Sequence, residues 1–153
     1  IRIQESDQLK KRPDPRMHSA EHILNQTMVS VYDCGRCFSA HIERKKSKCD
    51  YHFDHKLTDQ EISDIQARVN AAIDSDLPVR ESFVSKETAE SLYNTQRLPD
   101  TVAEDVRIVH IGDYDACPCI GEHVSSTAEI GRFKITTASF EDGVLRIRFK
   151  LAQ

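Results

Sequence analysis

Four side chains able to bind a metal ion occur in two pairs with the same spacing. His18 and His22 lie four residues apart near the start of the chain, and Cys119 and His123 lie four apart much further along it. Residues i and i+4 share one face of a helix, so the two histidines can approach one ion from the same side. Three imidazoles and one thiolate are a donor set that zinc accepts in a tetrahedral site. A chance histidine pair on a helix is the alternative, and the second pair favours the metal.

Two further cysteine groups have spacings that occur in redox or metal sites. Cys34 and Cys37 form a CxxC pair, and Cys117 and Cys119 flank Pro118. A single CxxC without a second one is a weak signal, so a structural role is favoured for Cys34 and Cys37. The five cysteines are an odd number, and the apolar core of a signal peptide is missing from residues 1–7. We therefore expect reduced thiols and a cytoplasmic location.

Length and composition predict one globular domain, residues 1–153. The chain is 39% hydrophobic and 30% charged, and it has no apolar run long enough to cross a membrane. Its net charge of −4 gives no overall attraction to nucleic acid. Local basic clusters lie at residues 10–12, 44–48 and 146–150. Most such clusters are solvated surface, yet the run from Arg44 to Lys48 is dense enough to hold a phosphate backbone.

The histidine pair is expected on a helix that follows an N-terminal arm of residues 1–15. Apolar residues recur at helical spacing from Arg16 to Tyr32, with Asp14 as N-cap, Pro15 at the first helical position and Gly35 as the left-handed stop. Residues 37–42 and 49–53 then predict a hairpin. Thr58 and Glu61 have the spacing of a capping box, which predicts a second helix that ends before Pro78.

The second half of the chain predicts strands around the Cys119–His123 motif. We expect strands over residues 79–84 and 106–111, a short helix over residues 86–93 capped by Ser85, and a break at Leu98–Asp100. Residues 131–137 and 144–149 predict a closing hairpin that turns at Glu141–Gly143. This order of elements favours an α+β domain, a largely antiparallel sheet with helices packed on it.

Both motifs resemble stretches of the editing domains of alanyl- and threonyl-tRNA synthetases. Residues 18–24, His-Ser-Ala-Glu-His-Ile-Leu, are similar to the HSAxHLL stretch of that family. Residues 119–124, together with Thr127, Glu129–Gly131 and Phe133–Ile135, resemble its CGGTHVxxTxEIGxFKI stretch. The segments Tyr51–Asp54, Leu57–Thr58 and Leu77–Val79 also follow the family order, so the resemblance runs from Met17 to about Phe149.

The resemblance implies the fold of the synthetases' second additional domain and a function in translation fidelity. Since neither flank is long enough for an aminoacylation domain, the chain resembles the free-standing members, known as AlaX, which deacylate mischarged tRNA in trans. Their substrate is the ester that joins serine or glycine to the terminal ribose of alanine tRNA. His18, His22, Cys119 and His123 match the zinc ligands of AlaX-type members, whereas the threonyl branch uses the equivalent residues without a firmly held metal.

The second motif departs from the family pattern at two positions. Alanyl-type members have Gly-Gly-Thr between the cysteine and the histidine, and Ile120, Gly121 and Glu122 stand here instead. A bulky side chain and a carboxylate beside the ion would alter the pocket or its electrostatics, so the amino acid that is removed stays open. Glu122 either accepts a hydrogen bond from a ligand imidazole or points to solvent.

Catalytic candidates are Ser39, His41 and Asp115, each with a structural alternative. Ser39 lies where the family places a hydroxyl that recognises serine, or it is an ordinary strand serine. His41 shares its strand face and is otherwise a surface histidine. Asp115 orients a ligand, binds ribose or caps a loop. The resemblance adds Gly121 to the substrate pocket, and the phosphates of the single-stranded acceptor end are expected against the loop cations Arg44 and Lys45 and against Lys134.

The role of the zinc ion has two versions. Four protein ligands leave no free position for water, which favours an anchoring role, and activation of water in an expanded coordination shell is the competing version. A zinc-bound Cys119 is a poor nucleophile. Two alternatives to a trans-acting deacylase remain: a catalytically altered zinc-binding module that interacts with tRNA, and a threonyl-type editing domain.

Overall fold

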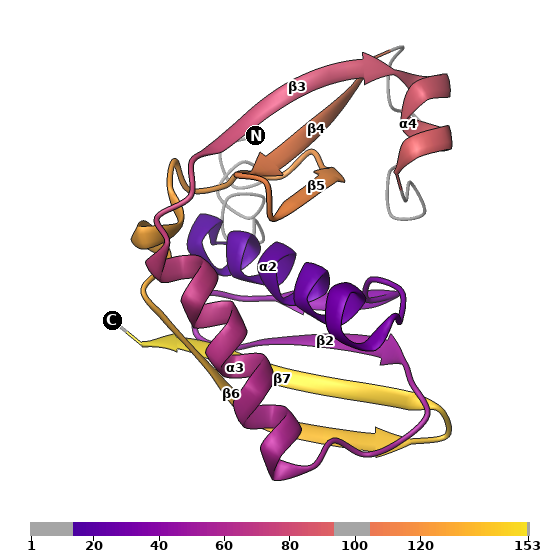
Figure 1. Cartoon of the computed structure of the whole chain (residues 1–153), viewed down its shortest axis with the longest axis vertical. Coiled ribbons are helices and arrows are strands. Elements are labelled where there is room, and N and C mark those ends of the chain that lie inside the picture. Colours follow the sequence, from indigo (N-terminus) through magenta and orange to yellow (C-terminus); the bar gives the residue numbers. More distant parts are fainter. Residues whose placement is uncertain (1–13, 94–104, 153) are drawn as a thin grey trace, which may run out of the picture.

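The computed structural model describes residues 14–93 and 105–152, which form two antiparallel sheets and three helices (Figure 1). The larger sheet has the strand order β1-β2-β7-β6, and the smaller one has the order β3-β4-β5. The helices are α2 (Pro15–Tyr32), α3 (Asp59–Asp74) and α4 (Lys86–Leu92), and a 3₁₀ turn, η1, spans Thr127–Ile130. The strands are β1 (Ser39–Ile42), β2 (Ser47–His52), β3 (Val79–Ser85), β4 (Asp105–Ile111), β5 (Asp115–Pro118), β6 (Arg132–Glu141) and β7 (Val144–Ala152).

Helix α2 begins where the sequence predicts, but a different residue forms its C-terminal cap. The carboxylate of Asp14 accepts hydrogen bonds from the backbone N–H groups of Arg16 and Met17, and Pro15 occupies the first turn. At the other end, Asp33 adopts the left-handed conformation with φ 53°, so the prediction that Gly35 fills this position was wrong. Aspartate tolerates this backbone region better than most residues, which removes the need for glycine.

Helices α2 and α3 cover one face of the larger sheet (Figure 1). Helix α3 has the predicted capping box, in which the Thr58 hydroxyl accepts from Glu61 N–H and the Glu61 carboxylate accepts from Thr58 N–H. The closing hairpin is also as predicted, because Asp142 and Gly143 both have positive φ and together make the tight turn between β6 and β7. The core lies between these helices and the inward side chains of the sheet.

The α+β class is confirmed, and the structure adds a second sheet that the sequence analysis did not separate. Strand β5 was not predicted, because it has only four residues and contains Pro118. It pairs with β4 through a turn at Gly112, which has φ 49°. This short strand directs the chain from β4 towards the N-terminal half of α2, and Cys119 follows it directly.

Parts of the predicted organisation fall outside the described residues. These are most of the N-terminal arm, residues 1–13, and the break predicted at Leu98–Asp100. Among the described helices, none combines the length and apolar character needed to span a bilayer.

Candidate metal centre

The two motif pairs converge on one buried point between α2 and the loop after β5. His18 and His22 come from the first two turns of α2, and Cys119 and His123 come from the loop. One donor atom from each of these residues lies within 4.8 Å of the others. The Cys119 Sγ is 3.5 Å from His18 Nε2 and 3.5 Å from His123 Nε2.

The donor set fits a zinc ion in chemistry and in spacing. Zinc–sulfur and zinc–nitrogen bond lengths at tetrahedral angles place sulfur about 3.5 Å from each nitrogen, which is the spacing of Cys119 Sγ from the two imidazole nitrogens. Cys119, His18 and His123 are thus already spaced for one ion, and a donor atom of His22 lies within 4.8 Å of theirs.

Each imidazole is oriented through its second ring nitrogen. The backbone carbonyl of Glu122 lies 3.2 Å from His18 Nδ1, and the Ser19 hydroxyl lies 2.9 Å from His123 Nδ1. The Asp115 carboxylate lies 3.5 Å from His22 Nδ1, which is buried and makes no shorter polar contact. Partners of this kind are common behind metal-binding histidines, because they fix both the ring orientation and the tautomer.

Asp115 is itself held by Arg36, which lies between the two cysteines of the CxxC pair. Arg36 donates to both carboxylate oxygens, at 2.7 and 3.3 Å. Burial raises the pKa of Asp115, but the contacts with His22 and Arg36 outweigh burial and hold that pKa below its usual value. Asp115 therefore remains ionised behind His22.

The thiol of Cys119 is set up to ionise. Burial raises its pKa, but hydrogen bonds with His123, His18 and His22 outweigh this effect and lower the pKa to about 3. Burial lowers the pKa of His22, whereas Asp115 and Cys119 raise it to about 9. A cation in the cluster would meet a ready thiolate and would compete with a proton on His22.

Gly121 permits the close approach of the loop to α2. A Cβ atom at this position would lie 2.2 Å from His18 Cε1. Its N–H group points at Cys119 Sγ, 3.4 Å away. Arg107 of β4 fixes the same loop by donating to the carbonyl oxygens of Cys119 and Gly121, at 3.1 and 2.7 Å. Sequence reasoning missed Arg107, whose role depends on the pairing of β4 with β5.

Glu21 is a second residue that sequence reasoning missed. Its side chain is buried, and Oε1 lies 3.7 Å from His18 Nε2 and 3.9 Å from His22 Nε2. The thiol of Cys37 donates to Oε2 at 3.7 Å, and Glu21, Cys37 and Cys49 form another group of adjacent ligand atoms. Its position in the sequence could have indicated this role, because Glu21 lies three residues after His18 and directly before His22.

The buried charges around the cluster match a divalent cation. Cys119, Glu21 and Asp115 supply three negative groups, and Arg36 supplies one positive group. The proton on His22, whose pKa is raised to about 9, offsets one more of these negative charges. A cation that displaces this proton would meet two uncompensated negative charges in a region that excludes water, where such charges are costly without a partner.

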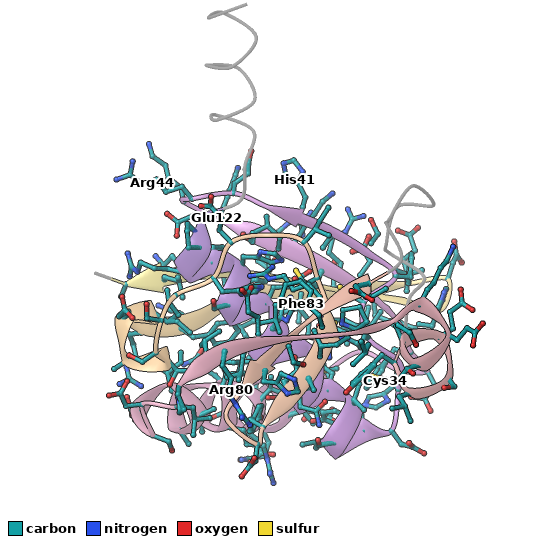
Figure 2. All side chains as sticks on the ribbon, turned by 90° about the horizontal axis from the view of Figure 1, so that it is seen from above. Cys34, His41, Arg44, Arg80, Phe83 and Glu122 are labelled. Atoms are coloured by element: carbon teal, nitrogen blue, oxygen red, sulfur yellow. The ribbon has the colours of Figure 1, made fainter. Side chains whose placement is uncertain are left out.

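The other predicted site residues lie outside this donor set. Ser39 and His41 are exposed on β1, on the face opposite Ala40 and Ile42, which pack against the core. His41 lies 3.2 Å from Glu43. The loop cations Arg44 and Lys45 are exposed in the turn between β1 and β2, and Figure 2 shows Arg44 and His41 projecting from the margin of the molecule. Lys134 is exposed on β6.

The residues that depart from the family pattern point outward. The Ile120 side chain is 69% exposed. The Glu122 side chain is also exposed (Figure 2). The backbone carbonyl of Glu122 lies 3.2 Å from His18 Nδ1. The two cysteines of the CxxC pair also diverge, because Cys34 donates to the Met28 carbonyl at 3.6 Å while Cys37 faces Glu21.

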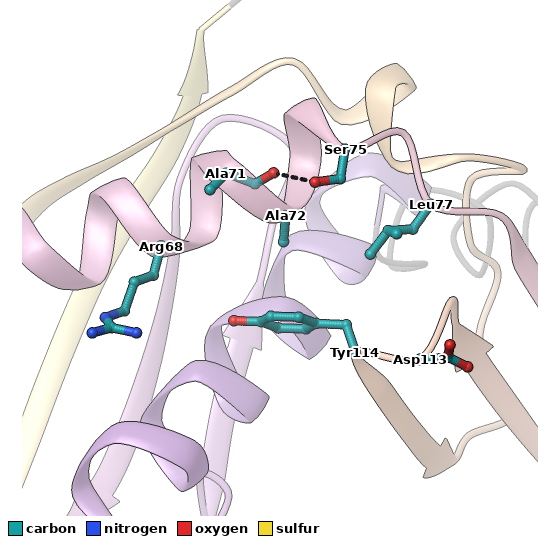
Figure 3. Close-up of a pocket in the computed structure, with 7 residues that line it drawn as sticks. All are labelled: Arg68, Ala71, Ala72, Ser75, Leu77, Asp113 and Tyr114. Atoms are coloured by element: carbon teal, nitrogen blue, oxygen red, sulfur yellow. Dashed lines mark hydrogen bonds between the residues drawn. The ribbon is translucent and has the colours of Figure 1, made fainter.

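A separate pocket lies between the C-terminal half of α3 and the turn between β4 and β5 (Figure 3). The ring of Tyr114 forms one wall, and its hydroxyl is hydrogen-bonded to Thr27. The pocket shares none of the four cluster residues; it is lined by Arg68, Ala71, Ala72, Ser75, Leu77, Asp113 and Tyr114.

Comparison with known proteins agrees with this arrangement. Residues 106–148, which include Cys119 and His123, match the family model of the threonyl and alanyl tRNA synthetase second additional domain. The chain is 32% identical to an alanine–tRNA ligase of Petrotoga mobilis over 143 residues, 92% of the chain and 16% of that protein. It is 30% identical to the alanine–tRNA ligase of Methanopyrus kandleri over 138 residues, 88% of the chain and 15% of that protein.

The same relationship extends to the alanine–tRNA ligase of Halorubrum lacusprofundi, which is 32% identical over 139 residues, 86% of the chain and 15% of that protein. The chain thus spans about one sixth of the length of these relatives. Together, the family match, the relatives and the α+β fold support an editing-domain-like protein, similar to the second additional domain of threonyl- and alanyl-tRNA synthetases.

Proposed function

We propose that this chain is a trans-acting aminoacyl-tRNA deacylase that removes serine or glycine from mischarged alanine tRNA. The observation that carries the proposal is the convergence of His18, His22, Cys119 and His123 at metal-binding distances in a chain related to the editing domain. The proposal includes one catalytic domain over residues 1–153 and a cytoplasmic location, where tRNA is charged.

In this proposal zinc is held by those four residues, and when bound it would supply fixed positive charge beside the ester. His18 lines the more accessible side of the cluster, whereas His22 forms its buried wall. Asp115 acts as a positioning residue for His22, and Arg36 keeps Asp115 in place. Gly121 leaves room for the imidazole of His18 and a backbone donor for Cys119.

The reaction is the hydrolysis of an activated ester. The oxygen of a water molecule bonds to the carbonyl carbon, and the bond from that carbon to the ribose oxygen breaks. One proton of the water ends on the ribose hydroxyl, and the amino acid leaves with a free carboxyl group. Ser39 and His41 are exposed on the outer side of β1 and are not members of the donor set, so their variants test whether they take part in the reaction.

A deacylation panel tests the proposal. Purified protein loaded with zinc is mixed with Ser-, Gly- and Ala-tRNA(Ala), Ser-tRNA(Thr) and Thr-tRNA(Thr), and release of the amino acid is followed. We expect cleavage of the first two substrates and loss of cleavage and zinc in His18→Ala. His41→Ala and Ser39→Ala are compared with it, and loss of activity with retained zinc in either would support a catalytic role for that side chain.

The panel also separates the alternatives. Cleavage confined to Ser-tRNA(Thr) would indicate a threonyl-type editing domain. Zinc binding and tRNA binding without cleavage of any ester would reject the deacylase and leave a zinc-binding module. Ile120 and Glu122, which replace the family residues between Cys119 and His123, are the observation that favours this zinc-binding module as a second candidate.

A further inference from the structure

The outer face of the larger sheet, on the side away from α2 and α3, carries a concentration of positive charge. Successive residues of a strand point to opposite faces. In β7, Leu145, Ile147 and Phe149 are buried against the core, so Arg148 and Lys150 project outward and are exposed. The adjacent strands place Lys48 and Lys134 on this outer face by the same alternation.

Strand register brings these cations directly opposite one another. Lys48 of β2 pairs with Arg148 of β7, and Lys134 of β6 pairs with Lys150 of β7. Like charges at directly opposed positions destabilise an antiparallel pair. Both pairs therefore lower the stability of the isolated sheet, which is unexpected for a face whose only task is to remain soluble.

The acidic group nearest to Lys48 and Arg148 acts on them through its field and is bound directly by another arginine. Asp50 is the acidic residue on this face of β2, and it is already bound by Arg146, with distances of 2.8 and 2.9 Å to its two oxygens. Within residues 14–93 and 105–152, neither Lys48, Lys134, Arg148 nor Lys150 forms an ion pair. Since the whole chain has a net charge of −4, this cationic face contrasts with the rest of the molecule.

We propose that this basic sheet face, defined by Lys48, Lys134, Arg148 and Lys150, binds the phosphate backbone of RNA. The proposal rests on the proposed function only in taking RNA as the partner. Paired strands lie about 4.8 Å apart, and alternate residues along a strand are about 6.7 Å apart. The cations thus form an open grid rather than a pocket, which suits a chain of phosphates better than a single small anion.

The basic sheet face and the metal cluster lie on different sides of the larger sheet. Helix α2, which carries His18 and His22, packs on the inner face (Figure 1). The body of an RNA bound on the outer face would therefore lie away from the metal cluster, and its 3′ end would extend to the cluster on the other side of the sheet. Arg44, in the turn between β1 and β2, adds positive charge at the margin of the molecule (Figure 2).

The test measures binding of uncharged tRNA(Ala) by fluorescence anisotropy over a range of salt concentrations. The double variants Lys134→Gln/Lys150→Gln and Lys48→Gln/Arg148→Gln are compared with Arg80→Gln/Lys86→Gln, which removes two exposed cations from β3 and α4. We expect each sheet-face variant to bind about tenfold more weakly and to reduce the slope of log affinity against log salt by about 2. The control variant is expected to bind like the wild type.

A second measurement guards against misfolding. Because each sheet-face variant removes one opposed like-charge pair, its denaturation midpoint should equal or exceed that of the wild type. Equal weakening by all three variants would refute the basic sheet face and indicate a general effect of net charge. A wild-type dimer that dissociates in the sheet-face variants would also refute it, because the face would then be an interface between protein copies.

The outcome is separable from that of the proposed function, since uncharged tRNA offers no ester to cleave. Sheet-face variants that bind tRNA like the wild type would overturn this proposal while leaving the deacylase intact. A protein that binds uncharged tRNA through this face but cleaves no ester would overturn only the deacylase.

Discussion

Gly121 shows how one absent side chain can determine whether a metal cluster forms. The family resemblance suggested a place for it in the substrate pocket, and the structure leaves no room for a Cβ between its backbone and the ring of His18. A methyl group there would overlap with His18 Cε1 at 2.2 Å. The residue is thus required for assembly of the donor set, whether or not substrate also contacts it.

We predict that Gly121→Ala weakens zinc binding at least tenfold, because His18 must leave its position. Competition with a coloured zinc chelator measures the affinity. Gly35→Ala is the matched control, since a Cβ at Gly35 meets nothing within 4 Å. Unchanged affinity in Gly121→Ala would show that the loop shifts freely.

Glu21 is expected to strengthen cation binding through its charge. In Glu21→Gln the shape is kept and one of the buried negative charges beside His18 and His22 is removed. We predict zinc affinity about tenfold lower, measured by the same chelator competition. Glu90→Gln, on the exposed side of α4, should leave the affinity unchanged. Equal zinc affinity in Glu21→Gln and Glu90→Gln would show that the charge of Glu21 does not contribute to zinc binding.

The pKa of His22 predicts how zinc affinity depends on pH. A ligand imidazole must be neutral, and His22 has a pKa raised to about 9, so zinc displaces one proton at any pH below that value. His123, with a pKa near 4, and Cys119, with a pKa near 3, add nothing in the neutral range. Apparent affinity should therefore fall about tenfold per unit of pH decrease between about pH 8 and about pH 6. A flat profile would contradict the raised pKa.

At the scale of elements, the C-terminal end of α3 is joined to the segment that follows the second motif. The Thr127 hydroxyl accepts from Leu77 N–H at 2.8 Å and lies 3.1 Å from the carbonyl oxygens of Ala72 and Ile73. Thr127 is fully buried in η1. Thr127 therefore connects α3 to η1, the turn that lies between β6 and the loop carrying Cys119 and His123.

We predict that Thr127→Val lowers the free energy of unfolding by about 1–3 kcal/mol, because the Leu77 N–H loses its acceptor in a buried position. Chemical denaturation monitored by circular dichroism measures the change. Thr136→Val, at an exposed position of β6, is the control and should change stability by less than about 0.5 kcal/mol. Similar values for both variants would show that water or another group replaces the hydroxyl.

At the scale of the whole molecule, the metal cluster links two segments that are remote in the chain. His18 and His22 belong to α2 near the N-terminus, whereas Cys119 and His123 follow the smaller sheet. An ion held by all four residues would bind the folded state far better than the unfolded chain. The ion would then connect α2, which packs on the larger sheet, to the loop that follows the smaller sheet. It would stabilise the fold in addition to any role in the reaction.

Zinc should accordingly raise the melting temperature of the wild type. A free zinc concentration about a thousand times the dissociation constant stabilises the folded state by about 4 kcal/mol, which differential scanning calorimetry detects as a rise of about 8–16 °C in the melting temperature. The chelator-treated wild type is the reference, and His18→Ala should show little response. An equal rise in His18→Ala would place the bound zinc elsewhere.

Local features of the sequence determined the element types and the kinds of donor atoms. Asp14 and Pro15 start α2, Thr58 and Glu61 start α3, and Asp142 and Gly143 turn the last hairpin. Each signal depends on residues within a few positions of one another, so it can be recognised without knowledge of distant packing. The four-residue spacings of His18 and His22 and of Cys119 and His123 likewise predicted the metal-binding residues from the sequence alone.

Only the tertiary structure decided what surrounds those donors. Asp115 reaches His22 and Arg36, and Glu21 reaches the imidazoles, because β5 pairs with β4 and places the second motif on α2. The cation pairs of the basic sheet face arise from strand register, which a shift of one residue would move to the opposite face. Long-range pairing is not encoded in local spacing, and for this reason these contacts could not be derived from the sequence alone.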